Sequence, residues 1–172
     1  MLSERTRERL RSIVGEAGFV SLPEELKVYE CDGYTLERSQ PELVILPQTT
    51  EELVAVIQLL HAERIPFVPR GAGTGLSGGC LPRSAPVMVG TSRMRRILEV
   101  DSRNRRVLVE AGVANLAVSQ RVRGSELYYA PDPSSQAACS IGGNVAEKSG
   151  GPHTLKYGVT TNHVLGLELV LP

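Results

Sequence analysis

The feature that most constrains this chain of 172 residues is a glycine-rich run, Pro69–Gly79. Five of the nine residues from Gly71 to Gly79 are glycine, and each glycine loses much backbone entropy on folding. Small residues let a ligand approach the backbone closely, and successive N–H groups in such a turn form an anion site. The run therefore predicts a loop that holds a phosphate group, for which a pyrophosphate is well suited. A plain tight connection is the less favoured alternative.

Two common phosphate-binding motifs do not fit this loop. Gly73, Gly75 and Gly78 have the G-x-G-x-x-G spacing, but that fingerprint requires a helix directly after it. Pro82 and Pro86 follow instead, and proline disfavours a helix. No Gly-Lys-Ser/Thr sequence follows either, which excludes a P-loop. We therefore expect a phosphate loop that joins two strands without a helix.

The pattern of apolar residues predicts a parallel unit in the first half of the chain. Apolar spacing indicates a helix over about residues 3–16, whereas residues 19–40 look irregular. Short apolar runs predict strands at 43–46, 67–68 and 87–89. Thr49 and Glu52 form a capping box for a helix between the first two strands, with Leu53, Val56, Ile57 and Leu60 as its buried stripe. Strand, helix and strand in this order predict parallel pairing with a right-handed crossover.

The second half predicts antiparallel pairing and a long polar loop. The runs 97–100 and 106–110 flank a turn, which indicates a β-hairpin. A short helix is expected at about 115–122 and a strand at 164–171, and the chain ends within or just after that strand. Between them, residues 128–158 are rich in Gly, Pro, Ser and Asn and are predicted to form one long loop.

That long loop carries a second candidate site. Pro131 and Pro133 stiffen a turn that presents the hydroxyls of Ser134 and Ser135, and the segments 140–146 and 149–152 add an amide and exposed backbone. Such groups suit the heteroatom rim of an isoalloxazine ring, and a solvent-exposed hydrophilic loop is the alternative. FAD contains both a pyrophosphate and this ring, so the two segments together favour FAD.

Composition excludes several other classes of function. Nineteen basic residues balance nineteen acidic ones, and aromatic residues make up 4%, so nucleic-acid binding is not expected. No apolar run approaches the roughly 20 residues of a membrane span, and the N-terminus lacks the features of a signal peptide. Three scattered cysteines indicate free thiols in the reducing cytoplasm, and the Cys and His residues lack metal-site spacing.

Several of these segments together resemble a known family. The segments are Tyr29–Gly33, Arg70–Gly79, Pro131–Gln136, Ser140–Glu147, Ser149–Gly151 and Leu155–Gly158. They are similar to the FAD-linked oxidases of the vanillyl-alcohol-oxidase/PCMH flavoproteins. Within that family, the FAD-binding subunit of glycolate oxidase and the D-lactate dehydrogenases are most alike. The likeness runs from about residue 25 to the end.

The resemblance implies an α+β fold of the PCMH type. A small parallel βαβ lobe (41–90) is followed by a larger lobe rich in antiparallel strands (91–172), incomplete at its C-terminus, with FAD in the cleft between them. Residues 1–40 would form an N-terminal helical and irregular arm, and 41–172 the FAD-binding domain.

The resemblance also implies the residues that bind FAD, which fall into two groups. The first group, around the pyrophosphate, comprises Arg70, Gly71, Ala72, Gly73, Thr74, Gly75, Leu76, Gly78 and Gly79. The second group comprises Pro131, Asp132, Pro133, Ser134, Ser135, Ser140, Ile141, Gly142, Gly143, Asn144, Ala146, Tyr157, Gly158 and Val159. Of these, Pro131–Ser135 and Ser140–Asn144 would line the flavin. The glycine loop has no His, so the implied FAD is non-covalent. Lys148 stands where the subgroup usually has Asn, and we expect its side chain to face solvent.

The function implied is oxidation of a 2-hydroxy acid, such as glycolate or D-lactate, to the 2-oxo acid by hydride transfer to FAD. Iron–sulfur subunits or a quinone would accept the electrons, with the protein in the cytoplasm or held at the inner membrane by partners. The catalytic and metal-binding residues would follow Pro172, so we name none and expect this chain alone to be inactive. The alternatives are a non-catalytic nucleotide-binding or interaction module and another PCMH-type flavoenzyme, such as an enolpyruvyl-sugar reductase.

Overall fold

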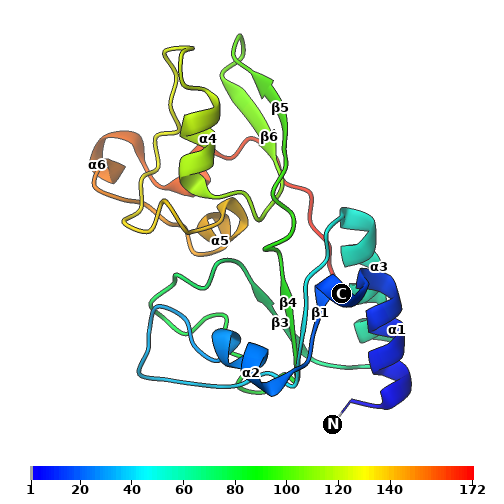
Figure 1. The fold of residues 1–172 in the computed structure, drawn as a ribbon. Coiled ribbons are helices and arrows are strands. Elements are labelled where there is room, and N and C mark those ends of the chain that lie inside the picture. Colours follow the sequence, from blue (N-terminus) through cyan, green and yellow to red (C-terminus); the bar gives the residue numbers. More distant parts are fainter. Residues whose placement is uncertain (1) are drawn as a thin grey trace. The chain divides into compact units, whose positions relative to one another are not determined.

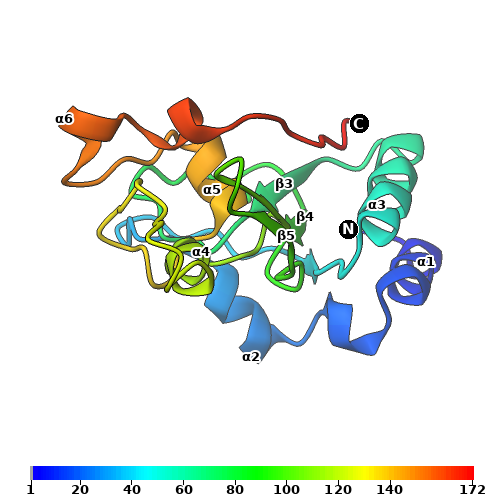
Figure 2. The same cartoon turned by 90° about the horizontal axis from the view of Figure 1, so that it is seen from above.

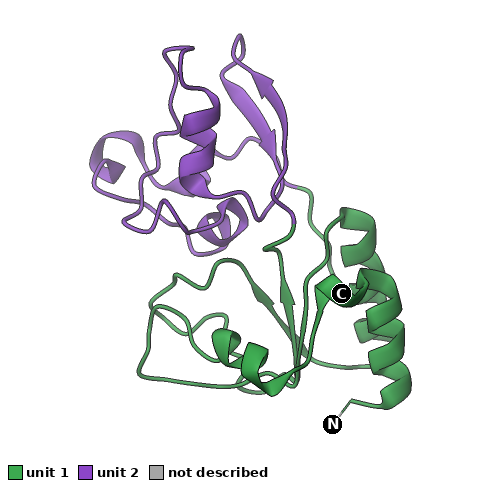
Figure 3. Cartoon of the chain, viewed as in Figure 1, with its two compact units in different colours: residues 1–93, 168–172 green, residues 94–167 purple. Residues whose placement is uncertain are grey.

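The computed structural model describes residues 2–172, which divide into two compact units. The first unit comprises Met1–Arg93 and Glu168–Pro172, and the second comprises Met94–Leu167 (Figure 3). Each unit has secondary structure of a different kind, and each is described here by itself.

A four-stranded sheet forms the centre of the first unit (Figure 1). Its strands lie in the order β1 (Phe19–Val20), β2 (Leu43–Ile45), β4 (Val87–Gly90) and β3 (Phe67–Arg70). The pairs β2–β4 and β3–β4 are parallel, which confirms the predicted parallel unit. The short strand β1 adds an antiparallel edge and lies in a region that we expected to be irregular.

Both faces of this sheet are covered, and its two central strands, β2 and β4, are accordingly buried and apolar. Alternate residues Leu43, Ile45, Val87 and Val89 pack against the helices α1 (Glu4–Val14) and α3 (Thr50–Ala62). These two helices lie next to each other in Figure 2. On the opposite face, Val44 and Met88 pack with Leu26 of the short helix α2 (Pro23–Leu26) and with Tyr29 of the 3₁₀ turn η2 (Lys27–Tyr29). A further 3₁₀ turn, η1 (Glu16–Gly18), precedes β1.

The helix boundaries agree closely with the sequence signals. Helix α1 is capped by Ser3 and ends at Gly15, which adopts a φ of 67°. Helix α3 begins after Thr49, whose side chain accepts a hydrogen bond from the Glu52 N–H. The predicted capping box is only half formed, because the Glu52 carboxylate accepts from the N–H of Gln48 rather than of Thr49. Neither of these two N–H groups has a partner within the helix, so a bond from the Glu52 carboxylate to either one satisfies a backbone donor at the helix start.

The second unit combines a β-hairpin with short helices. The hairpin consists of β5 (Ile97–Asp101) and β6 (Arg106–Val109), which pair antiparallel as predicted. The helical elements are α4 (Asn115–Arg121), α5 (Ile141–Ala146), α6 (Thr154–Tyr157) and the 3₁₀ turn η3 (Thr160–His163). The prediction of one continuous loop over 128–158 is therefore wrong, since two helices interrupt it.

The predicted strand at 164–171 is also absent. Within the part of the chain that the structure describes, no neighbouring strand pairs with this segment. A β-strand requires a partner for its backbone groups, and apolar composition alone does not supply one. Two of its leucines are accordingly exposed, Leu165 at 84% and Leu169 at 68%.

Two general findings bear on the site. Among the helices of residues 2–172, none has both the length and the apolar character that a membrane crossing requires. The same residues contain no group of three or more His, Cys, Asp and Glu side chains that could bind a metal ion.

Candidate functional site

The glycine loop connects β3 to β4 without an intervening helix, as the sequence predicted. From Gly71 to Ser77, seven consecutive backbone N–H groups donate no hydrogen bond to any acceptor in residues 2–172. Residues 71–77 are half-buried or exposed, so a ligand can reach these backbone groups from solvent. The loop leaves a row of donors free for a ligand with many acceptor oxygens.

Backbone conformation explains why glycine occupies this loop. Gly73 and Gly78 have φ angles of +70° and +69°, a region that other residues enter only with strain. At Gly73 a Cβ atom would also collide with the guanidinium of Arg70, and at Gly78 it would lie 2.8 Å from the Arg83 guanidinium. The loop is therefore tightly packed against two cations and presents backbone rather than side chains.

Arg70, the last residue of β3, places a positive charge beside the loop. Its side chain is buried, Nη1 donates to Sγ of Cys80 at 3.2 Å, and the guanidinium lies 5.6 Å from the centre of the Tyr29 ring. Burial raises the pKa of the Cys80 thiol, although the charge of Arg70 opposes this. Burial likewise raises the pKa of Tyr29. Cys80 and Tyr29 therefore both stay neutral, and the charge of Arg70 remains available to an anion.

In the second unit, a buried amide relay holds the Pro131–Ser135 turn. Asn115, at the start of α4, donates from Nδ2 to the carbonyl oxygen of Pro131 at 2.9 Å. Its Oδ1 accepts from Nδ2 of Asn144, also at 2.9 Å. Asn115 is 1% exposed and Asn144 is 2% exposed. The relay thus ties together α4, the proline turn and α5. The N–H groups of Ser134 and Ser135 donate to no acceptor that the structure describes.

The segment 140–144 differs from the exposed loop that we expected. Ser140 and Asn144 are buried, and Ser140 caps α5. The N–H of Ile141 donates to the Val113 oxygen, and that of Gly142 donates to the Ala111 oxygen, both at 2.8 Å. A Cβ at Gly142 would lie 2.8 Å from that of Ala111. The backbone donors of Ile141 and Gly142 therefore fix α5 in its own unit, and the amide of Asn144 is buried there.

The remaining predicted residues form a polar group on the surface of the second unit. Asp132 accepts hydrogen bonds from the backbone N–H of His153 and pairs with its ring Nδ1, which lowers the pKa of the Asp132 carboxyl. Hydrogen bonds from Tyr128 and Lys156 lower the pKa of Tyr157. The hydroxyl of Thr154 is buried with no partner in the described residues. His153 lies between the two predicted residues, since it pairs with Asp132 and its ring lies 6.4 Å from that of Tyr157.

The last two predicted residues follow directly after α6. Gly158 has a φ of +82° and ends that helix, and the Val159 N–H donates to Oδ1 of Asn162 at 3.1 Å. Sequence reasoning gave no role to Asn115. Its signal was a single amide in an otherwise apolar stretch, too weak to indicate a buried relay.

The comparison with known families now decides the identity of this fold. Residues 41–172 match the family described as FAD binding domain. The chain belongs to this family. The predicted resemblance is confirmed, and FAD is the cofactor of the family. The loop fits this cofactor, because its free N–H groups, its lack of side chains and the Arg70 charge all suit a pyrophosphate.

The curated relatives include glycolate oxidase subunits and a D-lactate dehydrogenase. Glycolate oxidase subunit GlcD of Escherichia coli (strain K12) is 49% identical over 160 residues, covering 93% of this chain and 32% of the relative. The GlcD subunit of Bacillus subtilis (strain 168) is 38% identical over 171 residues, covering 99% of this chain and 36% of the relative. D-lactate dehydrogenase of Anaerostipes hadrus is 37% identical over 135 residues, covering 78% of this chain and 28% of the relative. The chain spans about a third of the length of these relatives.

Solved structures support the fold class. Alkyldihydroxyacetonephosphate synthase superposes with a TM-score of 0.85 at 21% identity, covering 96% of this chain and 32% of that chain. The structure of 4-ethylphenol oxidase from Gulosibacter chungangensis superposes with a TM-score of 0.75 at 22% identity, covering 86% of this chain and 29% of that chain. At these identities the likeness concerns the fold alone, and it confirms the PCMH-type fold that we predicted.

Proposed function

We propose that this chain is the FAD-binding part of a flavoenzyme that oxidises a 2-hydroxy acid, of the glycolate or D-lactate type, to the 2-oxo acid. The similarity to glycolate oxidase and D-lactate dehydrogenase supports the substrate class. FAD, when bound, supplies the hydride acceptor, and the protein supplies binding, orientation and charge. The E. coli relative is named as a subunit, which supports partner subunits that take the electrons onward.

The observation that carries the proposal is the row of seven unpaired N–H groups from Gly71 to Ser77. In the first unit, this row with Arg70 would hold the pyrophosphate of FAD. Thr74 and the residues through Gly79 belong to the same loop. In the second unit, the Pro131–Ser135 turn, with its two free serine N–H groups, would contact the flavin ring, whose carbonyl oxygens accept hydrogen bonds.

The structure refines the proposed flavin-side residues. Ile141 and Gly142 use their N–H groups within the second unit, and Asn144 uses its amide there. We therefore propose that these residues act on the flavin through the turn that they support. Asp132, Tyr157 and Gly158 remain proposed contacts from the surface of the same unit.

Titration of the purified chain with FAD tests the proposal, with flavin fluorescence and protein NMR as readouts. We expect FAD to bind more tightly than FMN or riboflavin, since only FAD presents a full pyrophosphate. Chemical-shift changes should include Gly71–Ser77. Equal binding of ADP and FAD, with no shifts in the second unit, would instead favour a nucleotide-binding module.

Dye reduction with glycolate or D-lactate tests the catalytic part. We expect no turnover from the 172-residue chain, because it spans about a third of the relatives' length and we assign it no catalytic residue. Robust turnover by the 172-residue chain would contradict this expectation.

A further inference from the structure

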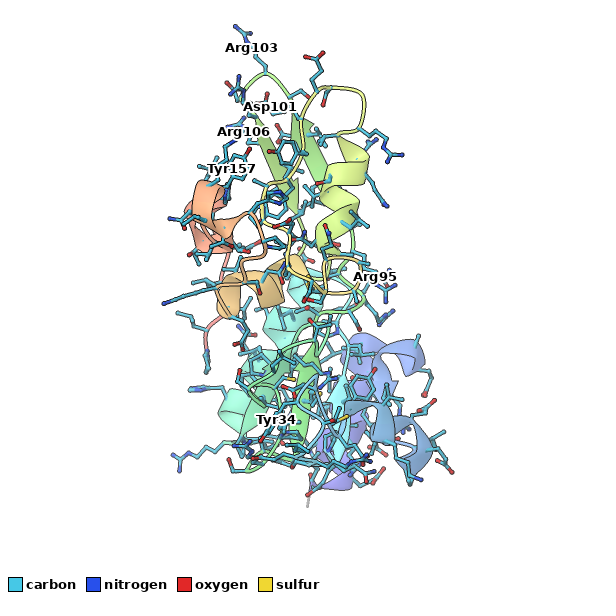
Figure 4. The ribbon with its side chains drawn as sticks, turned by 90° about the vertical axis from the view of Figure 1, so that its left-hand side faces the viewer. Tyr34, Arg95, Asp101, Arg103, Arg106 and Tyr157 are labelled. Carbon is cyan, nitrogen blue, oxygen red and sulfur yellow. The ribbon has the colours of Figure 1, made fainter. Side chains whose placement is uncertain are left out.

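A buried carboxylate lies behind the glycine loop, although it precedes Gly78 of that loop by 46 residues in the sequence. Asp32 is 6% exposed. Its Oδ2 accepts a hydrogen bond from the N–H of Gly78 at 3.0 Å, and this contact is buried. Its Oδ1 accepts from the N–H of Tyr34, labelled in Figure 4, at 2.8 Å. The two oxygens of one carboxylate thus join a turn in the N-terminal segment to the far end of the loop.

The residue after Asp32 packs directly against the loop backbone. A Cβ added at Gly33 would lie 2.7 Å from the carbonyl oxygen of Gly75 and 3.0 Å from that of Thr74. In a trans peptide the N–H points opposite to the C=O. Because these two carbonyls face Gly33, the N–H groups of Gly75 and Leu76 point away from it. Those N–H groups belong to the unpaired row.

We propose that Asp32 is a positioning residue for the pyrophosphate of FAD, which rests on the proposed function of the loop. By holding the Gly78 N–H, its carboxylate fixes the end of the loop and, with Gly33 behind it, turns the free donors toward the ligand. The family match covers residues 41–172, so Asp32 extends the binding machinery into the N-terminal segment.

The carboxylate of Asp32 is compatible with this role, although the proposed ligand is an anion. Each carboxylate oxygen accepts a hydrogen bond from a backbone N–H, so neither oxygen is buried without a partner. Asp32 and Arg70 both act on the nearby Cys80 thiol, with opposite effects on its pKa. Arg70 therefore adds a positive charge to the region that holds the Asp32 carboxylate.

Asp32→Ser separates the two bonds that this residue makes. A serine hydroxyl can accept from the N–H two residues on, as in a turn of this kind, so the turn to Tyr34 survives. Its side chain is too short to reach Gly78. Asp32→Ala removes both bonds. The control is Asp101→Ser in the second unit, since the Asp101 carboxylate also accepts from a backbone N–H, that of Asn104 at 3.0 Å, but in an exposed turn away from the loop (Asp101 is labelled in Figure 4).

The experiment measures FAD affinity by fluorescence titration, and hydrogen exchange of the Gly78 amide by NMR, in the full chain. For Asp32→Ser we expect a rise in Kd for FAD of about tenfold, the usual scale for loss of a hydrogen bond to a charged group. Gly78 exchange should accelerate while the amides of the β2–β4 sheet stay protected. Asp101→Ser should change neither the Kd nor the exchange of Gly78.

The outcomes separate this inference from the proposed function. A folded wild-type chain that binds no FAD overturns the proposed function. Wild-type binding with an unchanged Kd in Asp32→Ser overturns the positioning role alone. Unchanged protection of Gly78 in both Asp32 variants likewise overturns it, whatever the FAD result. If the sheet amides lose protection in Asp32→Ala but keep it in Asp32→Ser, the alanine variant has lost its fold. The Kd and the Gly78 exchange of Asp32→Ser then decide the positioning role.

Discussion

Asn115→Leu is expected to lower the free energy of unfolding by about 2 to 6 kcal/mol. The reason is the buried relay, in which Asn115 donates to the Pro131 carbonyl and accepts from the Asn144 amide, each at 2.9 Å. Leucine has a similar volume but leaves both partner groups unpaired in the interior. Each buried unpaired group costs about 1 to 3 kcal/mol, and two groups give the range stated.

Urea denaturation followed by circular dichroism measures this loss. A double-mutant cycle with Asn144→Leu isolates the bond between the two amides, and we expect the double variant to cost less than the sum of the single variants by about 0.5 to 3 kcal/mol. Asn104→Ala is the matched control, since Asn104 bonds only at the exposed hairpin turn. A loss below about 1 kcal/mol for Asn115→Leu, or strict additivity in the cycle, would refute the reasoning.

Asn115→Asp adds a pH-dependent version of the same test. A buried carboxyl favours its neutral form, and only the protonated acid can donate to the Pro131 carbonyl, so its folded-state pKa should rise. A raised folded pKa means that stability is greatest below the unfolded pKa of about 3.9 and is lost as the pH rises through the folded value. The variant should therefore be less destabilised at pH 5 than at pH 8. A constant deficit would contradict this.

The remaining predictions concern three other positions. Gly73→Ala should lower stability by about 1 to 2 kcal/mol in urea denaturation, because alanine is strained at a φ of +70°, and should weaken FAD binding in the fluorescence titration. Burial of the Glu110 carboxyl raises its pKa, but hydrogen bonds from Arg96 outweigh this and lower it. Because the pKa of this carboxyl is lower in the folded state than in the unfolded state, the ionised carboxylate stabilises the fold above the unfolded pKa. The free energy of unfolding of wild type should therefore exceed that of Glu110→Gln by less as the pH falls from about 6 to 3. Lys148 is exposed with a φ of 53°, and Lys148→Asn should raise the thermal midpoint slightly and leave the flavin midpoint potential unchanged.

The phosphate loop was predictable because its signal is local. Five glycines in a short run, followed by two prolines, limit the backbone to a strand–loop–strand path, and the structure has no helix between β3 and β4. The same holds for the cap at Thr49, whose side chain bonds a backbone group three residues away. In both cases the deciding interaction lies within a few residues of sequence.

The second segment was harder to predict because its structure depends on distant contacts. Glycine at 142 and 143 weakens a helix, yet both lie in α5. The helix forms because Ser140 caps it and because the backbone of 141–142 bonds to residues 111 and 113. The strand predicted at 164–171 failed for the opposite reason, since its apolar pattern meets no neighbouring strand.

The sequence by itself determined the family, the parallel first unit and the position of the glycine loop, because glycine spacing and apolar periodicity restrict the backbone directly. Only the tertiary structure decided which side chains hold that backbone in place. The carboxylate of Asp32 reaches Gly78 across 46 positions of sequence, and Asn144 reaches Asn115 across 29. Such contacts depend on how strands and helices pack in three dimensions, and no local pattern of residues reports them.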